Sequence, residues 1–119
     1  MIHLDTHAVI WMHDGELERF SPSAKQLLNG HRPMISPMVR LELAFLHQIG
    51  RLRVDPVTML HTLENQIDLG VAESQFPRVA AIACGLQWTR DPFDRMIAAH
   101  AIADDVPLLT KDATMLAHC

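Results

Sequence analysis

Residues 91–110 read DPFDRMIAAHAIADDVPLLT, and this stretch decides the fold. Asp91 and Pro92 have the residue types of a helix N-cap and of a first helical position. The apolar residues that follow at intervals of three and four predict a helix over residues 93–103. Residues 106–110 form a short apolar run that predicts a strand. A helix that leads directly into a buried strand is typical of a parallel α/β sheet.

The same alternation continues toward the N-terminus. Apolar runs and turn residues predict strands at 1–5, 33–36 and 67–71 and helices at 8–13, 22–29, 37–50, 56–66 and 73–86. Thr6 is expected to cap the first of these helices. Short apolar strands that alternate with helices predict a three-layer α/β/α sandwich with a central, mainly parallel sheet of four or five short strands. At 119 residues, we expect one domain over residues 1–119.

The composition excludes several classes of protein. About half of the residues are hydrophobic, which is enough for a core, and the formal net charge of −4 argues against a protein that coats nucleic acid through a basic surface. Two cysteines give no disulfide framework, and Cys84 lies in an apolar segment where we expect it to be buried. No signal peptide or membrane-spanning run is evident, so a soluble cytoplasmic protein is expected.

Four acidic residues occupy positions where a solvated side chain is not expected. Asp5 ends an apolar run, Asp112 directly follows the last predicted strand, and Glu42 and Asp94 lie on apolar helix faces. A carboxylate at the edge of a core is costly unless a positive charge compensates it. Because ligands of parallel sheets bind beyond the carboxyl ends of the strands, the four acids can converge there. The pattern predicts a divalent metal site of the kind that acts on phosphates.

Several of these residues also have purely structural interpretations. Asp5 and Asp112 each fit the N-cap of a following helix, the latter over residues 113–117. Thr6 and Thr110 flank the expected site, where their hydroxyls would hold carboxylates or a metal-bound water, but capping and strand propensity explain them equally well. Asp91 is assigned to capping alone.

Histidine and arginine add little specific signal. The spacing of the eight histidines does not match a zinc site, and His7 is the one expected near the cleft. The others are expected at the surface or its boundary: His3, His13, His31, His47, His61, His100 and His118. Arg40 and Arg95 neighbour the two helical acids, where each would steady a carboxylate, contact a phosphate, or serve only a structural role.

Three segments together resemble a known family. The segments LDTHAVIW (residues 4–11), SPMVRLELAFLHQIGRL (36–52) and DPFDRMIAAHAIADDVPLLTKD (91–112) are similar to those of the PIN-domain ribonucleases, and within them to the toxins of VapBC toxin–antitoxin pairs. The metal-binding acids of the family fall on Asp5, Glu42, Asp94 and Asp112, and Thr110 matches a frequent Thr or Ser before the last acid. Members usually continue into a final edge strand, which we do not expect in a chain that stops at Cys119.

The resemblance implies a function and its requirements. It implies RNA cleavage with Mg²⁺ or Mn²⁺, the cognate small antitoxin as a partner, and a homodimer. Two alternatives stay open. One is a catalytically silent domain that only binds its antitoxin. The other is a phosphoacceptor signalling domain, which normally has adjacent acids after its first strand, whereas Asp5 stands alone.

Overall fold

Four short parallel strands form the sheet of the computed structural model, which describes residues 1–110. The strands are β1 (Ile2–Leu4), β2 (Pro33–Ile35), β3 (Gly70–Val71) and β4 (Leu108–Leu109). Their order in the sheet is β3-β2-β1-β4, so β1 lies between β2 and β4 although β4 comes from the far end of the chain. Within residues 1–110 every strand pairing is parallel, which confirms the predicted sheet type.

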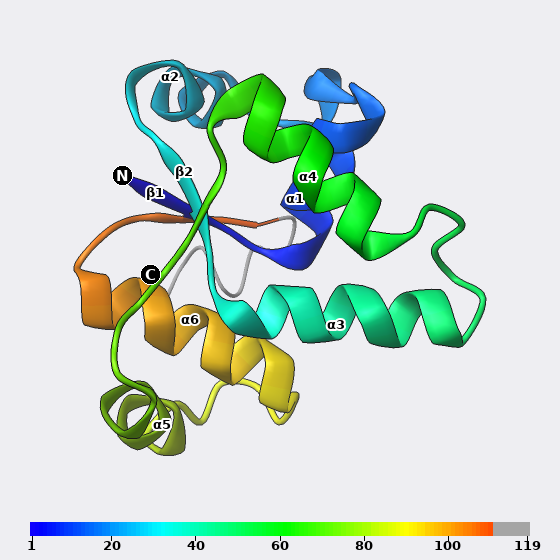
Figure 1. Cartoon of the computed structure of the whole chain (residues 1–119). Coiled ribbons are helices and arrows are strands. Elements are labelled where there is room, and N and C mark those ends of the chain that lie inside the picture. Colours follow the sequence, from blue (N-terminus) through cyan, green and yellow to red (C-terminus); the bar gives the residue numbers. More distant parts are fainter. Residues whose placement is uncertain (111–119) are drawn as a thin grey trace.

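Helices cover both faces of this sheet. They are α1 (Thr6–Asp14), α2 (Pro22–Gly30), α3 (Pro37–Gln48), α4 (Pro56–Ile67), α5 (Phe76–Cys84) and α6 (Pro92–Asp104), with a short 3₁₀ turn at Leu17–Arg19. In the view of Figure 1, α1, α2 and α4 lie above the strands and α6 lies below them, with α5 packed on its outer side. This arrangement is the predicted α/β/α sandwich.

Four helices begin with a polar cap followed by proline. Ser21, Ser36, Asp55 and Asp91 each accept a hydrogen bond from a backbone N–H of the first helical turn, and each is followed by Pro. The cap satisfies an N–H that lacks a helical partner, and Pro has no N–H to satisfy. These starts agree with the sequence prediction.

Some predicted boundaries were wrong. The strand expected over residues 67–71 contains only Gly70–Val71, because α4 continues through Ile67 and ends at Asp68 in the left-handed conformation (φ 56°). The helix expected over residues 73–86 begins only at Phe76, since Pro77 takes a position in its first turn. The last strand is limited to Leu108–Leu109.

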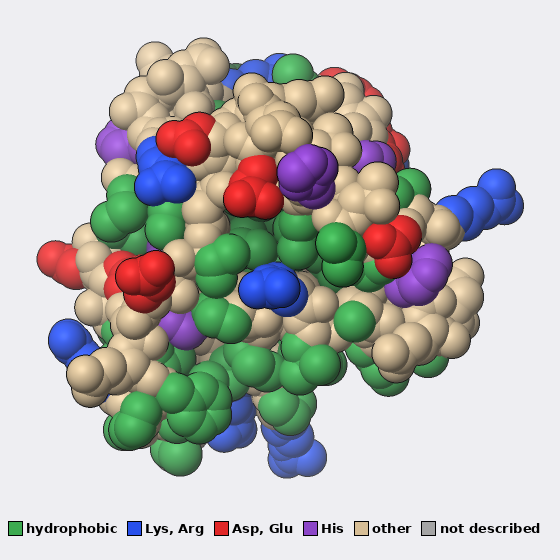
Figure 2. Space-filling view, in the orientation of Figure 1, with side chains coloured by type: hydrophobic (Ala, Val, Ile, Leu, Met, Phe, Trp, Pro, Cys, Tyr) green, Lys and Arg blue, Asp and Glu red, His purple; other side chains and the backbone are tan. Residues whose placement is uncertain are grey.

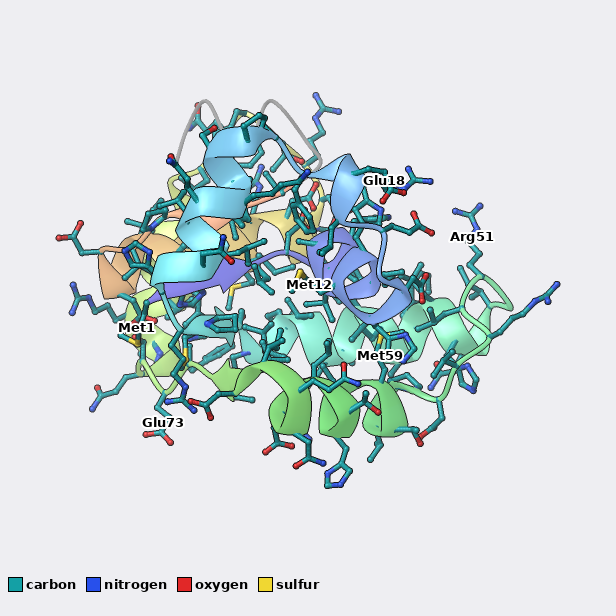
Figure 3. All side chains as sticks on the ribbon, turned by 90° about the horizontal axis from the view of Figure 1, so that it is seen from above. Met1, Met12, Glu18, Arg51, Met59 and Glu73 are labelled. Atoms are coloured by element: carbon teal, nitrogen blue, oxygen red, sulfur yellow. The ribbon has the colours of Figure 1, made fainter. Side chains whose placement is uncertain are left out.

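The core is aliphatic and lies mainly between the sheet and its helices. Its fully buried side chains include Leu4, Ile35, Leu43 and Ile97. Figure 3 shows Met12 and Met59 among the helices, whereas Arg51 and Glu73 extend outward. A smaller cluster of Val79, Ala83 and Ala99 holds α5 against α6. Cys84, which was expected in the core, is exposed at the end of α5.

Candidate functional site

Asp5 is fixed at the carboxyl end of β1. Its backbone N–H donates to the carbonyl of Leu109 (2.9 Å), and its side chain is nearly buried, with 5% of its surface exposed. Oδ1 accepts the N–H of Ala8 (2.8 Å) and caps α1, while Oδ2 accepts the hydroxyl of Thr110. Asp5 therefore caps this helix in place of Thr6, which was the predicted cap.

Glu42 approaches the same edge of the sheet from α3. Its carboxylate, which is half-buried, accepts a hydrogen bond from the hydroxyl of Thr6 at the start of α1. Since Thr6 directly follows Asp5, this bond brings the side of α3 that carries Glu42 to the end of β1. Both predicted threonines therefore contact predicted acids: Thr110 contacts Asp5, and Thr6 contacts Glu42.

Asp94 lies in the first turn of α6. Asp91 caps this helix by accepting the N–H groups of Phe93 (2.8 Å) and Asp94 (3.4 Å), as predicted. The rings of Phe93 and Phe45 lie 6.2 Å apart between centroids, so the start of α6 packs on the helix that carries Glu42. The carboxylate of Asp94 is half-buried.

Arg95 has a structural contact in the described part of the chain. Its Nε–H donates to the carbonyl of Thr89 (2.7 Å), which holds the loop before α6 against the helix. Arg40 is exposed and lines a groove between α3 and α4. The hydrogen bond from Arg95 to Thr89 therefore agrees with a structural role for this arginine, which was one of the roles considered from the sequence.

The fourth predicted acid, Asp112, lies outside the described residues, as does the helix expected at residues 113–117. Among residues 1–110, no group of three or more His, Cys, Asp or Glu side chains is arranged to hold a metal ion. The donor types nevertheless suit a hard divalent cation, because Asp5 and Glu42 both offer carboxylate oxygens. The residues present thus fit such an ion in chemistry.

Two histidines expected near the surface are buried in the core. His3 is 1% exposed and His100 is 3% exposed, and their rings stack with centroids 6.2 Å apart. His3 Nε2 is hydrogen-bonded to Asp104 Oδ2 (2.7 Å), and Asp104 Oδ1 accepts the hydroxyl of Ser74. The sequence carried a signal for both, because His3 interrupts a buried strand and His100 lies on the apolar face of α6.

Burial changes the acid–base behaviour of this pair. Burial lowers the pKa of His3, and this outweighs the raising effect of Asp104. Burial, followed by the neighbouring His3, also lowers the pKa of His100. For Asp104, burial raises the pKa, but the hydrogen bonds from Ser74 and His3 and the nearby histidines together lower it. Both imidazoles are therefore held toward their neutral forms.

A groove of about 800 Å³ between α3 and α4 is lined by none of the predicted acids. Its lining is mainly apolar and includes Ile35, Leu41, Ala44, Val57, Leu60 and Leu69. Figure 2 shows hydrophobic side chains gathered across this face, with isolated charged and histidine side chains around them. The acidic residues of its lining, Asp55 and Glu64, are exposed and are not among the acids predicted for the site.

The structure defines a parallel α/β protein with carboxylates at the carboxyl end of a central strand, which is where such sheets bind ligands. The family follows from comparison of the whole chain. The PIN domain model matches residues 2–118, and the chain therefore belongs to the PIN domain family. This confirms the resemblance at the level of the family.

The fold is shared with a solved structure. The crystal structure of VapBC2 from Rickettsia felis, bound to a DNA fragment from its promoter, matches with a TM-score of 0.63 and 18% sequence identity. The match covers 95% of this chain and 89% of that chain. No curated protein sequence matches the chain. No helix within residues 1–110 is long and apolar enough to cross a membrane.

Proposed function

We propose that this protein is a metal-dependent endoribonuclease and the toxin of a VapBC-type toxin–antitoxin pair. One observation carries the proposal: in a chain of the PIN domain family, Asp5 and Glu42 are both held at the carboxyl edge of the sheet by threonine hydroxyls. Asp94 and Asp112 complete the proposed set of ligands for Mg²⁺ or Mn²⁺. The similarity in fold to a toxin–antitoxin complex supports the assignment to this class.

The residues of the chain would prepare the site in a defined way. The hydroxyl of Thr110 donates a hydrogen bond to Asp5 Oδ2, and the N–H of Ala8 donates one to Oδ1. The carboxylate is therefore oriented before any ligand arrives. Thr6 orients Glu42 in the same manner. These acids would hold a divalent cation, which would supply a Lewis acid for activating water and for offsetting negative charge on the phosphate. In the proposed reaction no side chain of the protein acts as a nucleophile.

Cleavage of single-stranded RNA by the purified protein tests this proposal. Activity should require Mg²⁺ or Mn²⁺ and stop with EDTA. Glu42→Gln should reduce the rate by roughly two to three orders of magnitude or more, because it removes a charge that holds the cation while keeping the size of the side chain. The rate is measured under single-turnover conditions with labelled RNA.

The matched control is Glu64→Gln, because Glu64 is an exposed glutamate on α4, a helix that carries none of the predicted acids. This variant should cleave at the wild-type rate. Equal activity of the wild-type protein and Glu42→Gln, or full activity in EDTA, would refute the proposed chemistry.

The proposed partner is a small antitoxin whose tail occupies the acidic edge of the sheet. An arginine of the partner would neutralise Asp5 and Glu42 as the cation does, and its guanidinium suits paired carboxylate oxygens. Co-expression with the product of an adjacent small gene should yield a stable complex that does not cleave RNA. Recovery of only the free protein would argue against a toxin–antitoxin pair. A homodimer and a cytoplasmic location are further parts of the proposal.

A catalytically silent, antitoxin-binding domain is the second candidate. The two candidates differ in one result, since the silent domain would form the complex but would not cleave RNA at any concentration of Mn²⁺.

A further inference from the structure

A buried polar framework connects the described elements that carry predicted acids. It consists of five side chains: His3, Ser36, Ser74, His100 and Asp104. Three of them, His3, Ser36 and His100, are almost completely inaccessible to solvent. The threonine contacts described above hold individual carboxylates, whereas this framework joins one element to another at positions away from the carboxylates themselves.

The first connection joins β1 to α6. His3 lies in the middle of β1 and is bonded to Asp104 at the end of α6 (2.7 Å). Asp5 follows His3 by two residues on the same stretch of chain, and Asp94 lies at the opposite end of α6. The bond therefore fixes the position of α6 along β1. Ser74, from the loop between β3 and α5, holds the second oxygen of Asp104.

The second connection joins α6 to α3. His100 Nδ1 is hydrogen-bonded to Ser36 Oγ (2.8 Å), and Ser36 is the N-cap of α3, where it accepts the N–H of Met38 (3.1 Å). The N-cap determines where a helix begins and therefore where Glu42 lies along it. Asp94 lies on α6 between one and two turns before His100.

We propose that this framework positions Asp5, Glu42 and Asp94 relative to one another, with His100 and Ser36 as positioning residues. The metal-related part of this inference rests on the proposed function. Buried hydrogen bonds have few alternative partners in a low-dielectric interior, so a shift of α6 would leave polar groups unpaired. An apolar contact would tolerate such sliding more easily, since packing alone is not directional.

The test compares three variants by Mn²⁺ binding and hydrogen exchange. His100→Leu removes the bond to Ser36, whereas His100→Asn places a hydrogen-bonding group close to the position of Nδ1. Met59→Ala is the matched control, because Met59 is fully buried on α4 and its truncation destabilises the core away from the framework. Calorimetric titration with Mn²⁺ alone is performed at a temperature where all variants are folded.

We expect His100→Leu to weaken Mn²⁺ binding by about tenfold or more, as for residues that orient metal ligands. His100→Asn should recover much of this affinity. Met59→Ala should bind Mn²⁺ as the wild-type protein does despite its lower melting temperature. Hydrogen exchange in peptides covering residues 36–43 and 92–97 should accelerate in His100→Leu and not in Met59→Ala.

The outcomes separate this inference from the proposed function. The inference would be overturned if His100→Leu had the Mn²⁺ affinity and hydrogen exchange of the wild-type protein. It would also be overturned if Met59→Ala changed both quantities as much as His100→Leu does. If the wild-type protein binds no Mn²⁺, the proposed function fails, and the exchange measurements alone decide whether the framework positions these elements.

If His100→Leu does not fold, Ser74→Ala replaces it, because Ser74 is only half-buried and its substitution removes one hydrogen bond to Asp104. Faster hydrogen exchange in residues 92–97 of Ser74→Ala would then support the inference, and wild-type exchange there would overturn it.

Discussion

Asp5 caps α1 and is also a proposed metal ligand, two roles that the sequence analysis treated as alternatives. One of its oxygens caps α1 through the N–H of Ala8, and the other accepts the hydroxyl of Thr110. Each carboxylate oxygen carries two lone pairs, so one oxygen can accept a hydrogen bond and also bind a cation. The cap and the predicted ligand role are therefore compatible in the same side chain, and substitutions can separate them.

Asp5→Asn should keep the cap and lose the charge. Because Asn caps helices about as well as Asp, the metal-free variant should be as stable as the wild-type protein or more stable, whereas Asp5→Ala should lose roughly 0.5–2 kcal/mol. Mn²⁺ should raise the melting temperature of the wild-type protein, because it binds only the folded state, and should raise that of Asp5→Asn much less. Urea and thermal denaturation with and without Mn²⁺ measure both effects. An undiminished metal response in Asp5→Asn would exclude Asp5 as a ligand.

His100 should make stability depend on pH. Burial and the adjacent His3 lower the pKa of His100 in the folded state relative to its usual 6.5. As pH falls below about 6.5, the unfolded chain gains a proton that the folded protein resists, so stability decreases toward acid. Asp104, which faces His3, has a lowered pKa and should contribute only at more acidic pH. The melting temperature should therefore fall between pH 7.5 and 5.5, and less steeply in His100→Asn. An equal slope in both proteins would contradict this account.

The start of α6 shows how much of an element can be predicted from its sequence. The Asp91-Pro92 pair correctly indicated the cap, because capping depends on the residue types of a few adjacent positions. The end of α4 was predicted within one residue, but Ile67 was assigned to the following strand and not to the helix. Ile67 is as compatible with a strand as with a helix, and the left-handed residue that ends the helix is Asp68 rather than the more usual glycine. Local chemistry therefore predicted the helix starts that have a polar cap and a proline, but not the start of α5, which has no side-chain cap.

Asp91 and Asp94 should respond differently to substitution. Asp91→Ala should destabilise the protein by roughly 0.5–2 kcal/mol, and Asp91→Asn should have little effect on stability or on cleavage, because Asn retains the cap. Asp94→Asn should reduce cleavage strongly, as proposed for a metal ligand. Chemical denaturation and RNA cleavage are measured on the same preparations. If Asp91→Asn abolishes cleavage and Asp94→Asn does not, the two roles are reversed.

At the scale of the whole molecule, the sequence predicted the layers and the parallel sheet, because alternating strands and helices strongly restrict the topology. It also predicted that Asp5 and Glu42 approach the same edge of this sheet. It did not predict the buried pairing of His3 with Asp104. These residues lie at opposite ends of the described chain, and nothing local to either one indicates the other. The contact of Thr6 with Glu42 was also not evident, since it depends on how α3 crosses the start of α1.

The position of β4 beside β1 has a consequence for synthesis on the ribosome. Asp5 receives its contacts from Leu109 and Thr110 only after residue 110 has been made, so the acidic edge is completed later than the other described parts of the fold. Contacts between distant parts of a chain also form slowly, because a long loop must close first. A chain truncated after Asp104 should lack cooperative unfolding and Mn²⁺ binding, which circular dichroism and calorimetry would detect. A nascent chain would thus lack these two contacts of Asp5 until residue 110 has left the ribosome.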